Sequence, residues 1–212
     1  MKVGRRNQNS NIILLAGAFA SALFLPRAHS EDLSGAALVS LLQQGGYVIV
    51  MRHASSPLTP PTAEKADPEN PVHQRQLDEA GREAARAMGT AFKTLHIPVG
   101  EVWSSPTYRA LQTVQLAELP RPQTAAELGD GGQSMTAVSA DGAAWLRAKA
   151  AQPPKPGTDT IIVTHYPNIT AAFGKAGDAP SDGEAILFRP GTPPAIIGRI
   201  KMDEWPKLAS HT

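Results

Sequence analysis

Three apolar stretches of the 212-residue chain each end in side chains that could carry out chemistry. These side chains are Arg52 and His53 after the first stretch, Ser104 and Ser105 at the end of the second, and His165 after the third. If the stretches are neighbouring strands of an open α/β sheet, the groups converge, because ligands bind beyond the carboxyl ends of such strands. Arg109 lies about one helical turn beyond Ser105 and can point to the same edge.

Two histidines and two arginines at one place would form an anion site that contains a nucleophile. Arginine presents a planar fork of donors that matches the oxygens of a phosphate group. The His53 imidazole could attack phosphorus and form a covalent intermediate. The His165 imidazole would donate to the equatorial oxygens and stabilise charge in the transition state. Nothing in this scheme needs a metal ion or an organic cofactor.

Hydrophobic periodicity predicts the elements that would position these groups. We expect strands over residues 47–51, 101–105 and 160–164, followed by closing strands over 185–189 and 195–202. We expect helices over residues 33–43, 77–95 and 107–117, and another that carries Trp145 and Leu146. Residues 55–75 are predicted to form a long loop, and residues 118–133 are predicted to be mostly loop. The alternation predicts an α/β fold, a three-layer α/β/α sandwich with a mostly parallel central sheet.

The first thirty residues have the features of an export signal. A basic start is followed by an apolar run over residues 12–25 and by Ala28-His29-Ser30, which offers small residues at a cleavage site. The run is shorter than the roughly 20 residues of a membrane-spanning helix. We therefore predict a signal peptide over residues 1–30, a single domain over residues 31–212, a periplasmic or secreted location, and no stable membrane insertion after cleavage.

Composition excludes several classes of function. The chain contains no cysteine, which rules out thiol catalysis and thiolate metal sites. Four of its 20 Lys and Arg residues lie in the predicted signal, so the remainder is mildly acidic against 19 Asp and Glu residues. A mildly acidic domain without a basic run gives no electrostatic reason to expect a nucleic-acid partner.

Four sequence blocks occur in a fixed order between about residues 47 and 189. They are Met51–Ala54, Arg75–Arg82, Ser104–Thr113 and Val163–Ile169. Together they resemble the signature blocks of the histidine phosphatase superfamily, which includes phosphoglycerate mutases and many phosphatases and has a phosphoglycerate mutase-like fold. The resemblance implies that His53 is the phosphorylated nucleophile and that Arg52, Arg109 and His165 surround the phosphoryl group.

Two residues depart from the superfamily pattern, and the proton donor is open. Ala54 stands where the pattern usually has glycine, and Tyr166 stands where glycine often follows the second histidine, so its ring could narrow the pocket or stack on a substrate. Resemblance to mutase-type members points to Glu127 as the acid that protonates the leaving group. Asp130 lies close behind it, and Glu184 is a further candidate.

The leading hypothesis is a metal-independent phosphomonoesterase that acts through a phosphohistidine intermediate. Its partner would be a small or exposed phosphate ester, either a phosphorylated small molecule or a cell-envelope component. The alternative is a non-catalytic phospho-ligand-binding protein of the same fold. A serine esterase is disfavoured because Ser104 and Ser105 lack a Gly-x-Ser-x-Gly elbow. Under a purely structural hypothesis, Arg109 would form a surface ion pair with Glu118 or Glu101.

Overall fold

The computed structural model describes residues 1, 4, 33, 35–57, 75–129 and 140–210. Most of the predicted signal peptide, and also Asp130, lie outside these residues. None of the described helices is both long and apolar enough to cross a membrane.

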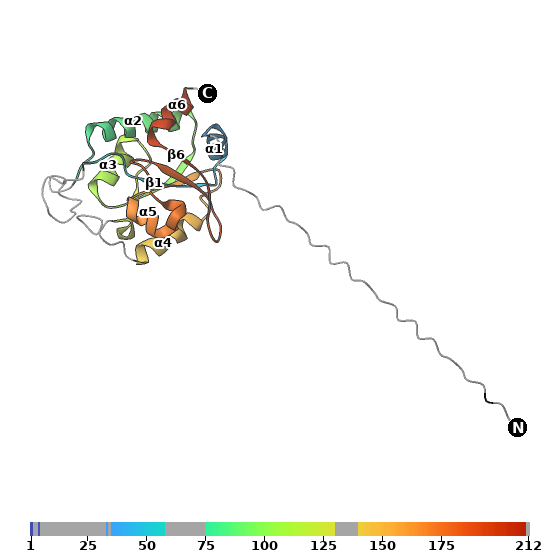
Figure 1. Ribbon diagram of the computed structural model, residues 1–212. Helices are drawn as coiled ribbons and strands as arrows, with labels where there is room; N and C mark the ends of the chain where they lie inside the picture. Colours follow the sequence, from blue (N-terminus) through green and yellow to red (C-terminus); the bar gives the residue numbers. More distant parts are fainter. Residues whose placement is uncertain (2–3, 5–32, 34, 58–74, 130–139, 211–212) are drawn as a thin grey trace.

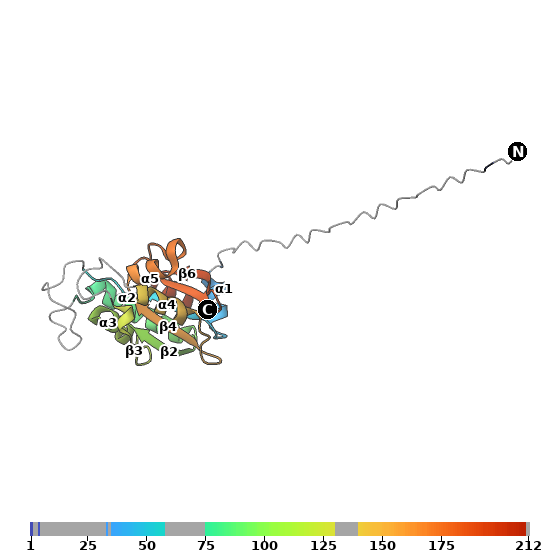
Figure 2. The same cartoon turned by 90° about the horizontal axis from the view of Figure 1, so that it is seen from below.

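A six-stranded sheet forms the centre of the domain (Figure 1). In spatial order its strands are β3 (Gln123–Thr124), β2 (Val99–Ser104), β4 (Asp159–Thr164), β1 (Val48–Arg52), β5 (Ala185–Arg189) and β6 (Ala195–Ile200). Neighbours from β3 to β1 run parallel, whereas β5 runs antiparallel to both β1 and β6. The predicted mostly parallel sheet is confirmed, and Figure 2 shows β2 and β3 towards one side of it and β6 towards the other.

Helices cover both faces of this sheet and complete the predicted three layers (Figure 1). One face packs against α1 (Gly35–Leu42), α2 (Glu79–Thr94), α3 (Tyr108–Leu116) and α6 (Trp205–Ala209). The other face packs against α4 (Ala140–Ala151) and α5 (Tyr166–Phe173). Short 3-10 turns complete the described chain: η2 (Ala126–Leu128), η3 (Gly174–Gly177) and η4 (Met202–Glu204).

The central strands are apolar along their whole length because both of their faces are covered. In β1, Val48 and Val50 join the core under α4 and α5, whereas Ile49 and Met51 join the core under α1, α2 and α3. Successive side chains of a strand point to opposite faces, so a strand between two helical layers needs a continuous apolar run. This requirement explains why the apolar runs in the sequence predicted these strands correctly.

Residues 118–129 are mostly loop, as predicted, and residues 130–133 lie outside the described part of the chain. Two short elements interrupt this loop: the edge strand β3, which pairs with Trp103 and Ser104 of β2, and the turn η2. A strand of two residues carries no periodicity of its own and forms because a neighbouring strand offers partners. Helices α5 and α6 were not predicted either, although each has proline in its first turn, a common signal of a helix start.

Strand register brings the chemically active residues to one edge of the sheet. β4 lies between β2 and β1, with Arg52 opposite Thr164 and Ser104 opposite Val163. The hydrogen bonding continues past the strand ends: the His53 N–H donates to the Thr164 carbonyl at 3.0 Å, and the Ser105 N–H donates to the Val163 carbonyl at 2.9 Å. The residues that follow the three strands therefore start from adjacent backbone positions.

A buried carboxyl group lies at the opposite end of β4. Asp159 begins the strand, and its Oδ1 accepts the Tyr47 N–H at 2.9 Å. Its Oδ2 is buried and has no hydrogen-bond partner among the described residues. Burial raises the pKa of Asp159 from 3.8 to about 7. The folded state therefore holds this proton more tightly than the unfolded state does, and the contribution of Asp159 to stability decreases as the pH rises from about 4 to about 7.

We expect the Asp159→Asn variant to gain stability relative to the wild type as the pH rises. The amide keeps an oxygen that can accept the Tyr47 N–H but does not ionise. The difference in the free energy of unfolding should shift in favour of the variant by roughly 2 kcal/mol between about pH 4 and about pH 8. Urea unfolding of both proteins across this range measures the shift, and a difference that does not change with pH would contradict the raised pKa.

Candidate active site

His53 is buried at the carboxyl end of β1, and the structure determines which of its nitrogens carries the proton. Its Nδ1 lies 2.7 Å from the Ala54 carbonyl oxygen, which can only accept a hydrogen bond. Its Nε2 accepts a hydrogen bond from Nε of Arg109 at 3.0 Å. The neutral ring therefore carries its proton on Nδ1 and has its lone pair on Nε2, facing Arg109. The Ala54 N–H in turn donates to the hydroxyl of Thr113 on α3 at 3.1 Å.

His165 is fully buried and is held by the same arginine. Nη2 of Arg109 lies 3.1 Å from its Nδ1, and because a guanidinium only donates, Nδ1 is the acceptor. The ring proton is then on Nε2, which lies 2.9 Å from Oγ of Ser105 and 3.3 Å from Oγ1 of Thr107. One guanidinium thus bridges the unprotonated nitrogens of two imidazoles, whose ring centroids are 5.2 Å apart.

Burial and positive charge keep both imidazoles neutral. The pKa of His53 lies well below its usual range, mainly because of burial and then because of the charges of His165 and Arg109. Burial is also the main cause of the strongly lowered pKa of His165, followed by the charges of Arg109, Arg75 and Arg52. A neutral imidazole retains the lone pair that a nucleophile needs, so the surroundings favour the reactive form of His53.

Arg52 ends β1 beside His53, and its side chain is partly exposed. Its Nη1 donates to the Pro180 carbonyl at 3.1 Å, and its Nη2 forms an ion pair with Asp182 at 2.7 Å. The structure therefore brings together Arg52, His53, Arg109 and His165, the four residues that the sequence blocks implied.

A third arginine joins the site, although the sequence analysis gave it no role. Arg75 is buried, its Nε lies 3.4 Å from Oγ of Ser56, and its charge contributes to the lowered pKa of His165. Its place as the first residue of the Arg75–Arg82 block was the available signal. The neighbouring hydroxyls of Thr107 and Thr113 were also given no role, although both residues lie in the Ser104–Thr113 block, which was the available signal.

The segment that carries Arg75 is tied to the residues after His53. The Ser56 hydroxyl donates to the Gln76 carbonyl at 2.7 Å, and the Ser55 hydroxyl donates to Oδ2 of Asp78 at 2.7 Å. Asp78 also caps α2 by accepting the Gly81 N–H at 2.7 Å. A Cβ atom on Gly81 would lie 2.1 Å from the Ser55 carbonyl oxygen, so glycine is required for this close approach.

Glu127, the first candidate for the proton donor, lies in η2 with an exposed side chain. The backbone around Glu127 is held by two side chains, one before and one after His165 in the sequence. The amide of Asn168 donates to the carbonyls of Glu127 at 3.2 Å and Gly129 at 3.0 Å, and the Thr164 hydroxyl donates to the Leu128 carbonyl at 2.9 Å. None of the described hydrogen bonds or ion pairs joins the Glu127 carboxylate to either histidine. Its role as an acid stays a prediction.

The alternative acids differ in what the structure says of them. Asp130 lies outside the described residues. The Glu184 carboxylate is buried and already engaged: one oxygen accepts the Ser181 N–H at 2.8 Å, and the other pairs with Arg199 at 3.3 Å. These contacts give Glu184 a structural task in the loop before β5.

The competing explanations of Arg109 and Ser105 do not fit the geometry. Glu118 pairs with Lys93 and Glu101 pairs with Lys149, so the predicted surface ion pairs of Arg109 are replaced by its contacts with the histidines. Ser105 does lie next to His165, but the other nitrogen of that ring faces a cation instead of the carboxylate that orients a catalytic base. A serine nucleophile would have no base to accept its proton.

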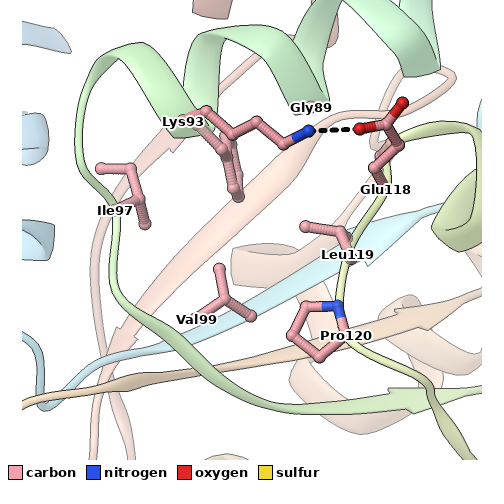
Figure 3. A pocket seen from close by; sticks show the side chains of 9 residues that line it. Gly89, Lys93, Ile97, Val99, Glu118, Leu119 and Pro120 are labelled. Carbon is pink, nitrogen blue, oxygen red and sulfur yellow. Dashed lines mark hydrogen bonds and ion pairs between the residues drawn. The ribbon is translucent and has the colours of Figure 1, made fainter.

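Among the described residues, neither a metal site nor a second hollow adds to the site formed by the histidines and arginines. Within the described part of the chain, no group of three or more His, Asp or Glu side chains is arranged to hold a metal ion. A separate hollow of about 170 Å³ lies between the end of α2 and the segment after α3 (Figure 3). Its lining is apolar apart from the Lys93–Glu118 ion pair at its mouth, and it contains none of the residues described above.

Comparison with known proteins agrees with the first three of the four sequence blocks. Residues 48–128, which include His53 and Arg109, match the model of the histidine phosphatase superfamily, branch 1. Over these residues the chain is similar to the histidine phosphatase superfamily. The second histidine, His165, lies beyond the matched residues and enters the site through β4. No curated protein sequence matches the chain.

Two solved structures share the fold of this chain. One is the protein histidine phosphatase SixA complexed with tungstate, with 17% sequence identity and a TM-score of 0.54 over 74% of this chain and 98% of that chain. The other is an Agrobacterium tumefaciens protein assigned to the SixA phosphohistidine phosphatases, with 16% identity and a TM-score of 0.51 over 73% of this chain and 97% of that chain. At this level of identity the similarity establishes the fold.

We expect the Arg109→Gln variant to raise the pKa of both histidines relative to the wild type, because a cation is removed from beside each ring. Burial, the largest cause, remains, so neither pKa should return to its usual value. Titration of the histidine ring protons by NMR measures this change. Arg147→Gln is a matched control, because Arg147 donates to the Ala171 and Ala172 carbonyls on α5. Unchanged titration in the Arg109 variant would contradict the assigned bridge.

Proposed function

We propose that this protein is a metal-independent phosphomonoesterase that acts through a phosphohistidine intermediate on His53. The observation that carries the proposal is the arginine bridge, in which Arg109 reaches Nε2 of His53 at 3.0 Å and Nδ1 of His165 at 3.1 Å. The bridge supports the proposal because it joins two buried neutral imidazoles, one of them the proposed nucleophile, to a guanidinium that could bind an anion at two points.

The reaction would proceed in two displacements. In the first, the lone pair on Nε2 of His53 attacks phosphorus, the P–O bond to the leaving group breaks, and the departing oxygen takes a proton from an acid. In the second, water attacks the phosphohistidine, the P–N bond breaks, and inorganic phosphate leaves. The hydrogen bond from Nδ1 of His53 to the Ala54 carbonyl orients the ring and would stabilise the positive charge that develops on it.

The charges around the nucleophile suit a phosphoryl group. Arg109 and Arg52 would donate to its oxygens together with Arg75. His165 would donate to an oxygen that gains charge in the transition state only after its Nδ1, which accepts from Arg109 in this structure, has gained a proton. When a phosphate enters, its oxygens would replace the two imidazole nitrogens as acceptors for Arg109. The partner would be a phosphorylated small molecule or a cell-envelope component, consistent with an exported protein that carries the predicted signal over residues 1–30.

Hydrolysis of p-nitrophenyl phosphate in EDTA by residues 31–212 is the first test. Wild-type activity should survive the chelator, and the His53→Asn variant should lose it by at least about 1,000-fold, because no nucleophile remains. The matched control is His96→Asn, since His96 is exposed with a φ of 53° that asparagine tolerates. Phosphate binding without turnover in the wild type would favour the non-catalytic phospho-ligand-binding protein instead.

A second test addresses the proton donor. If Glu127 protonates the leaving group, Glu127→Gln should reduce kcat/KM for an alkyl phosphate such as glycerol phosphate by about 100-fold or more. The same variant should retain most of its activity on p-nitrophenyl phosphate, because nitrophenolate leaves without help from an acid. Equal losses on both substrates, measured by phosphate release, would exclude this role for Glu127.

A further inference from the structure

One loop contacts both Arg52, the last residue of β1, and His53, which follows it. Residues 180–184, here called the 180–184 loop, lead directly into β5. Within it, the Gly183 N–H donates to the His53 carbonyl at 2.9 Å, and the Glu184 carbonyl accepts the Arg52 N–H at 3.2 Å. The loop reaches this edge because β5 is antiparallel to β1, which places Ala185 opposite Met51.

Two contacts from the same loop hold the Arg52 guanidinium. The Pro180 carbonyl accepts from Nη1 at 3.1 Å, and Oδ1 of Asp182 pairs with Nη2 at 2.7 Å. Both terminal nitrogens therefore have partners. The Nε–H, by contrast, is buried and has no hydrogen-bond partner among the described residues. A buried donor without a partner costs folding free energy, and in native proteins such a group calls for an explanation.

The loop owes its shape to contacts that do not involve Asp182. The Glu184 carboxylate accepts the Ser181 N–H at 2.8 Å and pairs with Arg199 at 3.3 Å. Gly183 has a φ of 72°, and a Cβ atom there would lie 2.6 Å from the sulfur of Met202. The Asp182 side chain is 39% exposed. Replacing it should therefore leave the loop backbone in place and change the surroundings of Arg52.

We propose that Asp182 is a positioning residue of the phosphatase site, which holds Arg52 by its terminal nitrogens so that the Nε–H donates to a phosphate oxygen. The inference rests on the proposed function and deepens it. Fixing a flexible arginine before the ligand arrives reduces the conformational entropy that is lost on binding. In the unliganded protein the unpartnered Nε is then the donor kept for the substrate.

An electrostatic role and a positioning role of Asp182 predict opposite changes in phosphate affinity when its side chain is removed, so an affinity measurement can separate the two roles. Asp182 is an anion close to an anion site, and its charge alone would repel phosphate, so its removal would tighten binding. If Asp182 positions Arg52, its removal frees the guanidinium and weakens binding. The sign of the change in phosphate affinity therefore distinguishes the positioning role from a purely electrostatic one.

The experiment measures the affinity for inorganic phosphate by calorimetry and kcat/KM for p-nitrophenyl phosphate in Asp182→Ala and Asp182→Asn. We expect Asp182→Ala to weaken phosphate binding and lower kcat/KM by about 10-fold, and Asp182→Asn by about 3-fold, since the amide keeps an acceptor oxygen. The matched control is Asp203→Ala, which breaks an exposed ion pair between Asp203 in η4 and Lys207 in α6 and should change neither value. Thermal unfolding of each variant monitors folding.

A double-mutant cycle tests whether Asp182 acts through Arg52. In an Arg52→Gln background, Asp182→Ala should cause no further loss of phosphate affinity, because its partner is gone. Tighter phosphate binding by Asp182→Ala, an unchanged affinity, or an equal loss in the Arg52→Gln background would each overturn the inference. Phosphate binding requires no turnover, so a wild-type protein that binds phosphate but hydrolyses nothing would contradict the proposed function alone.

Discussion

The contact of one buried arginine with two buried histidines is the interaction on which the rest of the site depends. Arg109 has only donors to offer, so Nε2 of His53 and Nδ1 of His165 must both be acceptors. Each ring then carries its proton on the other nitrogen. Nδ1 of His53 donates a hydrogen bond to the Ala54 carbonyl, and Nε2 of His165 donates one to the Ser105 hydroxyl. The protonation state, the orientation of both rings and the direction of the nucleophilic lone pair follow from this arrangement.

The arrangement is costly to bury, and this cost explains how the surrounding segments are built. Polar groups taken out of water need partners, and an unpaired charge in the interior is especially unfavourable. Here the histidines satisfy the arginine, hydroxyls of Ser105 and Thr107 satisfy His165, and Thr113 joins α3 to the residue after His53.

Loops from two directions fix the rim of the site. Thr164 and Asn168 hold the carbonyls of residues 127–129 on one side, and the 180–184 loop encloses Arg52 on the other. Both depend on the sheet: the first loop follows the edge strand β3, and the second precedes the antiparallel strand β5. Because β5 runs antiparallel to β1, the 180–184 loop that precedes β5 reaches the carboxyl edge of the parallel strands.

The sequence by itself determined the elements that have a strong pattern and the residues that sit at their ends. The apolar runs of β1 and β4 are legible because both faces of these strands are covered, and His53 and His165 stand out because they follow those runs directly. Arg109 stands out by its position about one helical turn beyond Ser105, which follows β2. The three-layer sandwich followed from the same alternation. Local patterns could not show β3, which forms only because β2 offers partners.

Tertiary structure decided the properties that arise from proximity between distant segments. The bridge from Arg109 to two rings, the effect of Arg75 on His165 and the pairing of Arg52 with Asp182 join residues that are between 56 and 130 positions apart, and no local spacing encodes such contacts. The lowered pKa of each histidine is of the same kind, because burial and neighbouring charges exist only in the folded chain. Residue types show which chemistry is available, and the sheet decides which groups meet to perform it.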